Sequence, residues 1–289
     1  MPSPRLLTPE LLRELEKRRF APKTRVEGQH AGRHMSPARG SSTEFRDYRA
    51  YTPGDDPARV DWRVYARNDR HVIRTYEQES QTGCVMLLDA SASMDFGDPV
   101  TKHRFATLAA ACLAHVVQHS QDQVGLLAVN DRDQAWLPPG GSARHLDNLL
   151  HALTDLQPRG VTDLPDALHR LSALLNRRCT LVVISDFYTP PADCFRALNP
   201  FLHRGLDIHL LHIQDPRERD LPEGDLLAFQ DLETGEKLTA DPAALQSTYN
   251  RVLEQHHRAY RELAMRRGIH YRIAPTHLPV FEPLSGLTQ

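Results

Sequence analysis

The sequence lacks the features of a membrane-spanning, nucleic-acid-binding or disulfide-bonded protein. None of its 289 residues lies in an apolar run that approaches the roughly 20 residues needed to span a bilayer. The formal net charge is only −2, so no overall field attracts nucleic acid or anionic lipid. The four cysteines lie far apart in apolar segments and form no CxxC pair, which argues against a disulfide framework or a zinc site. We therefore expect a cytoplasmic protein with no membrane segment and no nucleic-acid partner.

Two common catalytic signatures are also missing. No G-x-x-x-x-G-K-[ST] loop is present to bind the phosphates of a nucleotide. No G-x-S-x-G turn surrounds Ser91 or Ser93. These absences argue against an ATPase and a serine hydrolase, and any nucleotide hydrolysis in the system would belong to a partner.

From Cys84 onward, apolar strand-like runs alternate with amphipathic helical segments. The run CVMLLD at 84–89 predicts a strand, and the apolar residues of 102–119 recur at steps of three and four, which predicts a helix. The alternation continues through TLVVISD and DIHLLHI to GIHYRIAP. Such a pattern with short connections predicts a doubly wound α/β domain whose mainly parallel, Rossmann-like sheet is covered on both faces.

The chain is predicted to have three parts. Residues 1–80 form a small N-terminal α/β satellite with a turn at Pro53–Gly54–Asp55–Asp56. Residues 81–276 form the doubly wound domain, in which 216–240 interrupt the alternation with a hairpin. Residues 277–289 are a C-terminal tail.

Oxygen-bearing side chains gather at the predicted carboxyl ends of the strands, where open α/β sheets bind ligands. Asp89 ends the first strand, and Ser91 and Ser93 follow it at alternate positions. Asp186 follows TLVVIS, and Thr162 precedes the helix that begins at 164. Hard oxygen donors of this kind suit Mg²⁺. Two carboxylates balance a dication and the other donors are neutral, so the ion would keep room for a carboxylate from another protein.

Two other interpretations of these residues stay open. The first is that these side chains do no more than cap helices: Asp89, Ser91 and Ser93 would cap the next helix. Thr162 would cap the helix at 164, and the negative charge of Asp163 would interact favourably with the dipole of that helix. Alternatively, a haloacid-dehalogenase-like magnesium phosphatase also has a nucleophilic aspartate after its first strand, which would be Asp89. That chemistry needs a carboxylate two residues later as general acid, and this position is Ser91.

Two groups of motifs resemble known families. The D-x-S-x-S motif at 89–93, with Thr162 and Asp186, resembles the metal-ion-dependent adhesion site (MIDAS) of von Willebrand factor A domains. The stretch YRAYTPGDDPARVDWRVYARNDRHVIRTYEQES, with LLDASASM and DLETGE, is similar to the bacterial family called domain of unknown function 58.

The resemblance implies a von Willebrand factor A-like fold with a divalent ion, Mg²⁺ (or Mn²⁺ or Ca²⁺), which the resting protein need not contain. The implied metal ligands are Asp89, Ser91, Ser93, Thr162 and Asp186. It also implies a partner, a MoxR-type AAA+ ATPase, and a chaperone-like role in assembling or activating other proteins. We therefore expect a non-enzymatic, metal-dependent interaction module that binds this ATPase and an acidic segment of a partner or client protein.

Overall fold

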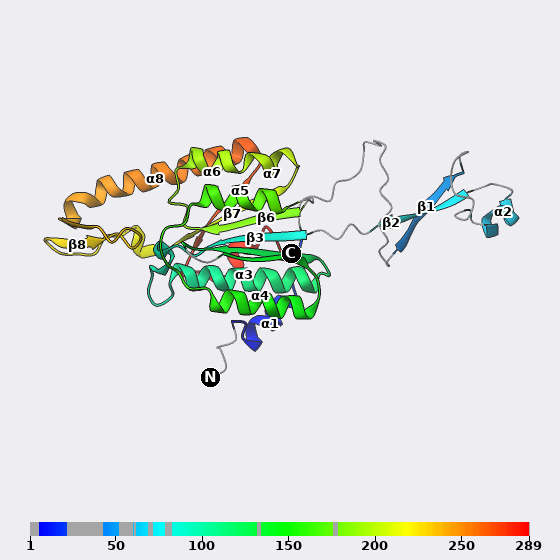
Figure 1. Ribbon diagram of the computed structural model, residues 1–289, viewed down its shortest axis with the longest axis horizontal. Helices are drawn as coiled ribbons and strands as arrows, with labels where there is room; N and C mark the ends of the chain where they lie inside the picture. Colours follow the sequence, from blue (N-terminus) through cyan, green and yellow to red (C-terminus); the bar gives the residue numbers. More distant parts are fainter. Residues whose placement is uncertain are drawn as a thin grey trace. The chain divides into compact units, whose positions relative to one another are not determined.

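The structure of the protein, a computed structural model, divides into two units (Figure 1). One unit comprises residues 26–81, and the other comprises 1–25 together with 82–289. The structure describes residues 6–21, 43–51, 60, 62–68, 72–78, 83–131, 134–175 and 179–288.

The smaller unit contains two strands and a helix. Strands β1 (Thr43–Ala50) and β2 (Val72–Gln78) pair in antiparallel fashion, with Ala50 opposite Val72. Helix α2 (Trp62–Asn68) lies between them in the sequence. This unit is therefore small and mixed α/β, and the predicted satellite limits of 1–80 stay a prediction. The predicted turn at 53–56 lies outside the described residues.

The larger unit is built on a six-stranded sheet with the order β10-β7-β6-β3-β4-β5. All neighbouring strands are parallel except β4 and β5. From β3 the chain adds strands on one side and then, after β5, on the other, so the topological switch point lies between β3 and β6. The predicted doubly wound, mainly parallel fold is therefore confirmed. The strands are β3 (Gly83–Asp89), β4 (Gln123–Val129), β5 (Gln134–Gly140), β6 (Cys179–Ser185), β7 (Asp207–Gln214) and β10 (His270–Pro275).

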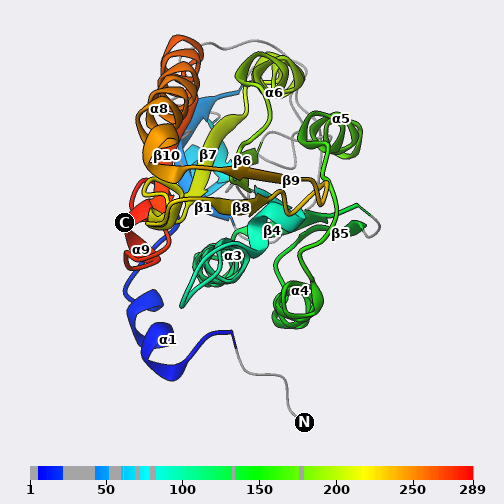
Figure 2. The ribbon, with the colours of Figure 1, turned by 90° about the vertical axis from the view of Figure 1, so that its left-hand side faces the viewer.

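Helices cover both faces of this sheet (Figures 1 and 2). One face is covered by α3 (Lys102–His119), α4 (Ala143–Asp155) and α9 (Phe281–Leu284), and α1 (Pro9–Leu15) packs against α3. The other face is covered by α5 (Leu164–Leu174), α6 (Pro191–Ala197), α7 (Asn199–His203) and α8 (Pro242–Arg267). No helix in the described ranges is both long and apolar enough to cross a membrane.

Strand β3 shows why the sequence is apolar without alternation. Met86 and Leu88 belong to the core beneath α3 and α4, whereas Val85 and Leu87 belong to the core on the opposite face. All four side chains are fully buried. A strand buried on both faces carries apolar residues at every position, so the polar Asp89 marks the point where the strand leaves the core.

Two segments differ from the sequence-based expectations. The stretch DCFRALNPFLHRG at 193–205 predicts one helix, but that helix is interrupted: α6 ends at Ala197 and α7 begins at Asn199, because Pro200 has no backbone N–H to continue a single helix. Helix α1 groups by its contacts with the sheet, whereas the sequence analysis placed it within residues 1–80. The other proposed domain limits stay predictions.

The predicted interruption before α8 does contain a hairpin. The short 3₁₀ helix η3 (Pro216–Glu218) follows β7, and β8 (Leu227–Gln230) then pairs antiparallel with β9 (Lys237–Ala240). Figure 2 faces the carboxyl ends of the parallel strands and shows β8 and β9 crossing in front of them. The hairpin therefore lies at the edge of the sheet that carries the predicted site.

Candidate functional site

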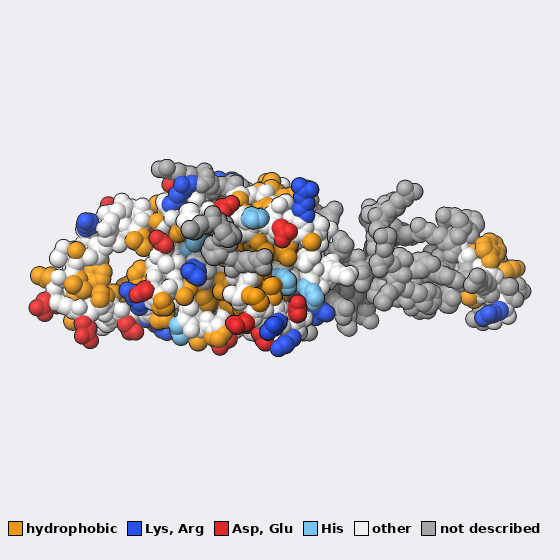
Figure 3. Space-filling view, turned by 90° about the horizontal axis from the view of Figure 1, so that it is seen from below, with side chains coloured by type: hydrophobic (Ala, Val, Ile, Leu, Met, Phe, Trp, Pro, Cys, Tyr) orange, Lys and Arg blue, Asp and Glu red, His pale blue; other side chains and the backbone are white. Residues whose placement is uncertain are grey.

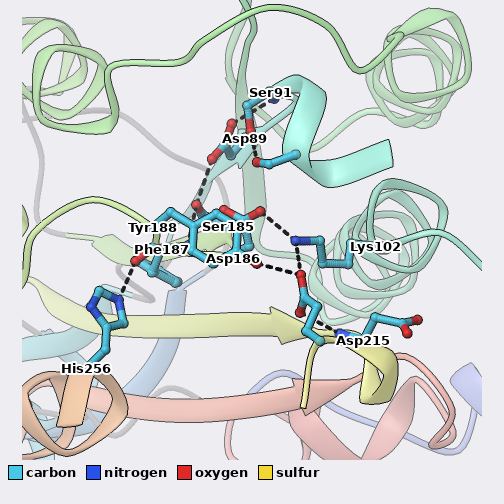
Figure 4. Close-up of polar contacts among 11 residues, drawn as sticks. Asp89, Ser91, Lys102, Ser185, Asp186, Phe187, Tyr188, Asp215 and His256 are labelled. Atoms are coloured by element: carbon cyan, nitrogen blue, oxygen red, sulfur yellow. Dashed lines mark hydrogen bonds and ion pairs between the residues drawn. The ribbon is translucent and has the colours of Figure 1, made fainter. Parts of the chain in front are cut away.

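Asp89 and the two serines after it form one buried polar cluster (Figure 4). Asp89 is 4% exposed; its Oδ1 accepts a hydrogen bond from the Ser91 backbone N–H (2.9 Å), and its Oδ2 accepts one from the Ser185 hydroxyl (2.7 Å). The hydroxyl oxygens of Ser91 and Ser93 lie 3.0 Å apart. Ser91 precedes the 3₁₀ helix η2 (Ala92–Asp95), but its side chain makes no capping bond. Capping therefore does not explain this hydroxyl.

The loop that carries Thr162 is fastened to the loop after Asp89. The Arg159 backbone N–H donates to the Ala90 carbonyl (3.0 Å), and the Ala92 N–H donates to the Gly160 carbonyl (2.9 Å). These bonds join segments about 70 positions apart in the sequence and bring the start of α5 to the end of β3.

Thr162 does not cap α5. The N-cap is Asp163, whose Oδ1 accepts a hydrogen bond from the Asp166 N–H (2.9 Å). Within the described part of the chain, the buried Oγ1 of Thr162 has no hydrogen-bond partner. A buried hydroxyl without a partner is unfavourable, so this atom is the clearest sign of a ligand at the site.

Asp186, just beyond β6, is paired with a buried lysine. Its Oδ2 accepts a hydrogen bond from Lys102 Nζ (2.7 Å), and the same ammonium donates to Glu218 Oε1 (2.5 Å). Lys102 is fully buried, and its ammonium lies 4.8 Å from the centre of the Tyr188 ring. The Tyr188 hydroxyl also donates to Glu218 (2.7 Å). Figure 4 shows Lys102 reaching Asp186 from the start of α3.

Sequence reasoning missed Lys102, Ser185, Tyr188 and Glu218. One signal for Lys102 was available: it is the first residue of α3, where the helix dipole disfavours a cation. A lysine at the start of a largely apolar helix needs nearby carboxylates to be stable there. No comparable signal marked Glu218, which comes from η3 after β7.

The shifted pKa values reflect burial and crowding of carboxylates. Burial, with a further contribution from the charge of Asp186, raises the pKa of Asp89 to about 6, although hydrogen bonds from Ser185 and Ser91 oppose the change. Burial acts to lower the pKa of Lys102, but the Asp186 and Glu218 carboxylates outweigh it and raise that pKa above its usual value. The repulsion from Asp186 at Asp89 and the raised pKa of Lys102 both indicate that carboxylates outnumber cations at the site.

A further carboxylate, Glu233, reaches this site from the turn of the hairpin. Burial raises its pKa, the nearby Ser93 hydroxyl lowers it, and the charge of Asp186 raises it again. With Asp89, Asp186 and Glu218, it makes four carboxylates around one ammonium, a net charge of −3 when all are ionised.

The residues present fit a hard divalent cation. The donors are carboxylate and hydroxyl oxygens, which Mg²⁺ prefers. The net negative charge would be largely offset by a dication, and the Thr162 hydroxyl still needs a partner. Of the predicted ligands, Asp89, Ser91 and Ser93 lie in direct contact along one loop, and Asp186 interacts electrostatically with Asp89.

A second group of metal-ligand side chains lies at the opposite ends of the strands. Asp207, His209 and His270 offer ligand atoms within 4.8 Å of one another. The Asp207 carboxylate lies 3.0 Å from His209 Nε2 and 3.5 Å from His270 Nε2. Pairing between one carboxylate and two imidazole rings accounts for these contacts without an ion.

Comparison with known proteins identifies related sequences of unassigned function. Residues 47–259 match the family described as protein of unknown function DUF58. The uncharacterized protein Rv1480 of Mycobacterium tuberculosis is 29% identical over 254 residues, which cover 86% of this chain and 79% of that protein. The uncharacterized protein Mb1516 of Mycobacterium bovis matches to the same extent.

Solved structures with a similar fold are more distant in sequence. The conserved hypothetical protein BatB from Bacteroides thetaiotaomicron has a TM-score of 0.47 at 14% identity, covering 67% of this chain and 90% of that one. An aerotolerance-related membrane protein from Bacteroides fragilis has a TM-score of 0.49 at 15% identity, covering 71% and 96%. The SpRpn10 VWA domain has a TM-score of 0.41 at 16% identity, covering 71% and 94%.

Proposed function

The chain belongs to the family described as protein of unknown function DUF58, and we propose that it is a non-enzymatic, divalent-metal-dependent protein-interaction module. Asp89, Ser91, Ser93, Thr162 and Asp186 would hold Mg²⁺ (or Mn²⁺ or Ca²⁺), as in the von Willebrand factor A sites that they resemble. A dication held there offers an electron-poor position to a carboxylate of a partner. The observation that carries the proposal is the buried Thr162 hydroxyl, which has no hydrogen-bond partner among the described residues, in a loop fastened to an oxygen-rich, negatively charged site.

Lys102 gives this site a stable form without an ion. Its ammonium neutralises Asp186 and Glu218 through two hydrogen bonds, so those carboxylates need no dication to remain buried. Asp89 is held by Ser185 and by the Ser91 backbone. The protein's own residues thus keep the ligands in place, which supports a resting state that need not contain the ion.

Metal binding can be tested by thermal and chemical unfolding with and without EDTA. A ligand that binds only the folded protein stabilises it by about 2.7 kcal/mol at 100 times its Kd. We expect Mg²⁺ or Mn²⁺ to raise the melting temperature of the wild type and not that of Asp89→Asn. Asp95→Asn, at an exposed position in η2, is the matched control and should respond like the wild type. Identical melting of the wild type in EDTA and in Mg²⁺ would contradict the proposal.

The proposed partner is a MoxR-type AAA+ ATPase, and the proposed setting is chaperone-like assembly or activation of client proteins in the cytoplasm. The family resemblance supports the partner, and the unpaired, buried cysteines are compatible with a reducing compartment. A pull-down with the purified ATPase tests the pairing. We expect retention in Mg²⁺ and loss with Asp89→Asn.

One feature favours the phosphatase alternative, with Asp89 as nucleophile. The Lys102 ammonium lies beside Asp186, where a cation could stabilise a phosphoryl group. The general acid is still missing, because the position two residues after Asp89 is Ser91. Hydrolysis of p-nitrophenyl phosphate that is abolished by Asp89→Asn would establish this alternative and overturn the non-enzymatic proposal.

A further inference from the structure

The turn of the β8–β9 hairpin, residues 231–236, is shaped by its own hydrogen bonds. Asp231 Oδ1 accepts from the backbone N–H groups of Glu233 (2.7 Å) and Thr234 (3.0 Å). The Gly235 N–H donates to the Asp231 carbonyl (2.9 Å), and Gly235 has a φ of +77°, which glycine adopts without strain. The turn therefore holds Glu233 in a fixed position at the end of the hairpin.

Glu233 is the residue of this turn that points toward the domain. Its side chain is half-buried, whereas its neighbours Leu232 and Thr234 are exposed, and the Ser93 hydroxyl is near enough to lower its pKa. The hairpin crosses the carboxyl ends of the strands (Figure 2). Ser93 and Asp89 are only 7% and 4% exposed, so the site lies beneath covering chain and is not an open surface.

We infer that Glu233 is an acidic ligand supplied from within the chain, in the position that the carboxylate of a partner would take. The inference rests on the proposed function, because that function requires the site to accept one carboxylate from outside. Glu233 has the required chemistry. It is the half-buried residue of the turn 231–236, in a hairpin that crosses the carboxyl ends of the strands, where the five predicted ligands lie. A partner would then bind only by displacing the hairpin.

The hairpin has features that make it easy to displace. Each of its strands has four residues, and a two-stranded hairpin is at best marginally stable alone. Leu226, Leu232 and Leu238 are 71%, 49% and 63% exposed, so these side chains contribute little burial that would hold the hairpin down. In Figure 3 hydrophobic side chains gather at the left end of the molecule, where the hairpin lies.

The test uses the full-length protein, Mn²⁺ as the probe, and three forms: wild type, Glu233→Gln and Glu236→Gln. Glu236 is an exposed residue of the same turn and serves as the matched control. We expect Glu233→Gln to weaken Mn²⁺ binding about tenfold, the usual size for loss of one supporting group. With Mn²⁺ present, it should also speed hydrogen exchange of the amides in 227–240 about tenfold. Glu236→Gln should change neither quantity.

Acetate tests whether an outside carboxylate can take this position. In Glu233→Ala, acetate should restore most of the lost Mn²⁺ affinity, and in the wild type it should have no effect because the position is filled. If Mn²⁺ binds the wild type but Glu233→Gln leaves both affinity and exchange unchanged, the inference is overturned while the proposed function survives. Faster exchange without a loss of Mn²⁺ affinity, or no acetate rescue, would also overturn it. If Mn²⁺ does not bind the wild type at all, it is the proposed function that fails.

Discussion

Among individual residues, Lys102 most affects how the site behaves. A fully buried ammonium at the start of a helix is unfavourable unless carboxylates surround it, and Asp186 and Glu218 do so here. The same ammonium repels a dication bound nearby. Lys102 therefore stabilises the site without an ion and weakens its affinity for one.

Replacing Lys102 should separate these two effects. In EDTA, Lys102→Met should lower the free energy of unfolding by about 3–5 kcal/mol, because two buried carboxylates lose their counter-charge. It should also bind Mn²⁺ more tightly than the wild type, so that metal restores part of the stability. Chemical denaturation with and without Mn²⁺ measures both changes. Lys17→Met, which removes an exposed ion pair with Glu14, should change neither; weaker Mn²⁺ binding by Lys102→Met would contradict this account.

The sequence could predict some residues of the site and not others, for a physical reason. Asp89, Ser91 and Ser93 are close in sequence and follow an apolar strand, so their proximity could be inferred directly. Asp186 was found because it follows another strand of the same parallel sheet. Glu218 and Glu233 lie in irregular segments after β7, and no periodic pattern shows which way such segments fold.

The loop 157–163 places Thr162, one of the predicted metal ligands, beside the end of β3. Gly160 has a φ of +62°, and a Cβ added to it would lie 2.1 Å from Asp131 Cγ. Only glycine allows this close approach, and the Gly160 carbonyl accepts the hydrogen bond from Ala92. The position of Thr162 thus depends on a glycine two residues away.

Gly160→Ala should therefore disturb the site through the backbone. Gly268, which ends α8 with a φ of +67° and has open space around it, provides a matched control for backbone strain alone. Each substitution should cost about 1–2 kcal/mol for a left-handed alanine, and Gly160→Ala should cost more because of the clash. Only Gly160→Ala should weaken Mn²⁺ binding, as measured by titration. Equal Mn²⁺ affinity in the two variants would show that this loop does not position a metal ligand.

Most helices could be predicted because their periodicity and caps are local. The helix predicted over 102–119 agrees with α3, whose N-cap Thr101 accepts a hydrogen bond from the Arg104 backbone N–H. The break between α6 and α7 was missed although Pro200 lies inside the predicted helix, where a proline removes a backbone hydrogen bond. The sequence pattern alone does not distinguish one interrupted helix from two consecutive ones.

For the whole molecule, the topology followed from strand–helix alternation, because parallel strands need crossover connections. The strand–helix alternation did not predict that residues 1–25 belong to the same unit as the sheet. That grouping depends on contacts far apart in the sequence, such as the bridge between Phe20 and Thr288 and the bond from the Phe20 N–H to the Ser120 hydroxyl (2.9 Å).

Buried histidines make the stability of the folded protein depend on pH. Burial is the main cause of a lowered pKa at His103, His115, His212 and His257. His212 is 4% exposed, and its Nδ1 lies 2.6 Å from the Tyr271 hydroxyl. Electrostatic repulsion from the neighbouring basic side chains, including Lys102, lowers its pKa further. The folded protein therefore keeps His212 neutral where the unfolded chain would protonate it.

Stability should consequently fall as the pH drops through about 6.5, the pKa of histidine in an unfolded chain. Between pH 7.5 and 5.5, one histidine that stays neutral when folded contributes a loss of about 1.4 kcal/mol. Asp89 has the opposite effect on the free energy of unfolding, because its raised pKa makes the folded protein bind a proton at a higher pH than the unfolded chain does. This contribution is the same in all the variants compared. In chemical denaturation at the two pH values, His212→Gln should lose about 1.4 kcal/mol less than the wild type. His151→Gln, on the exposed face of α4, should match the wild type; an unchanged pH dependence in His212→Gln would mean that His212 is protonated in the folded protein.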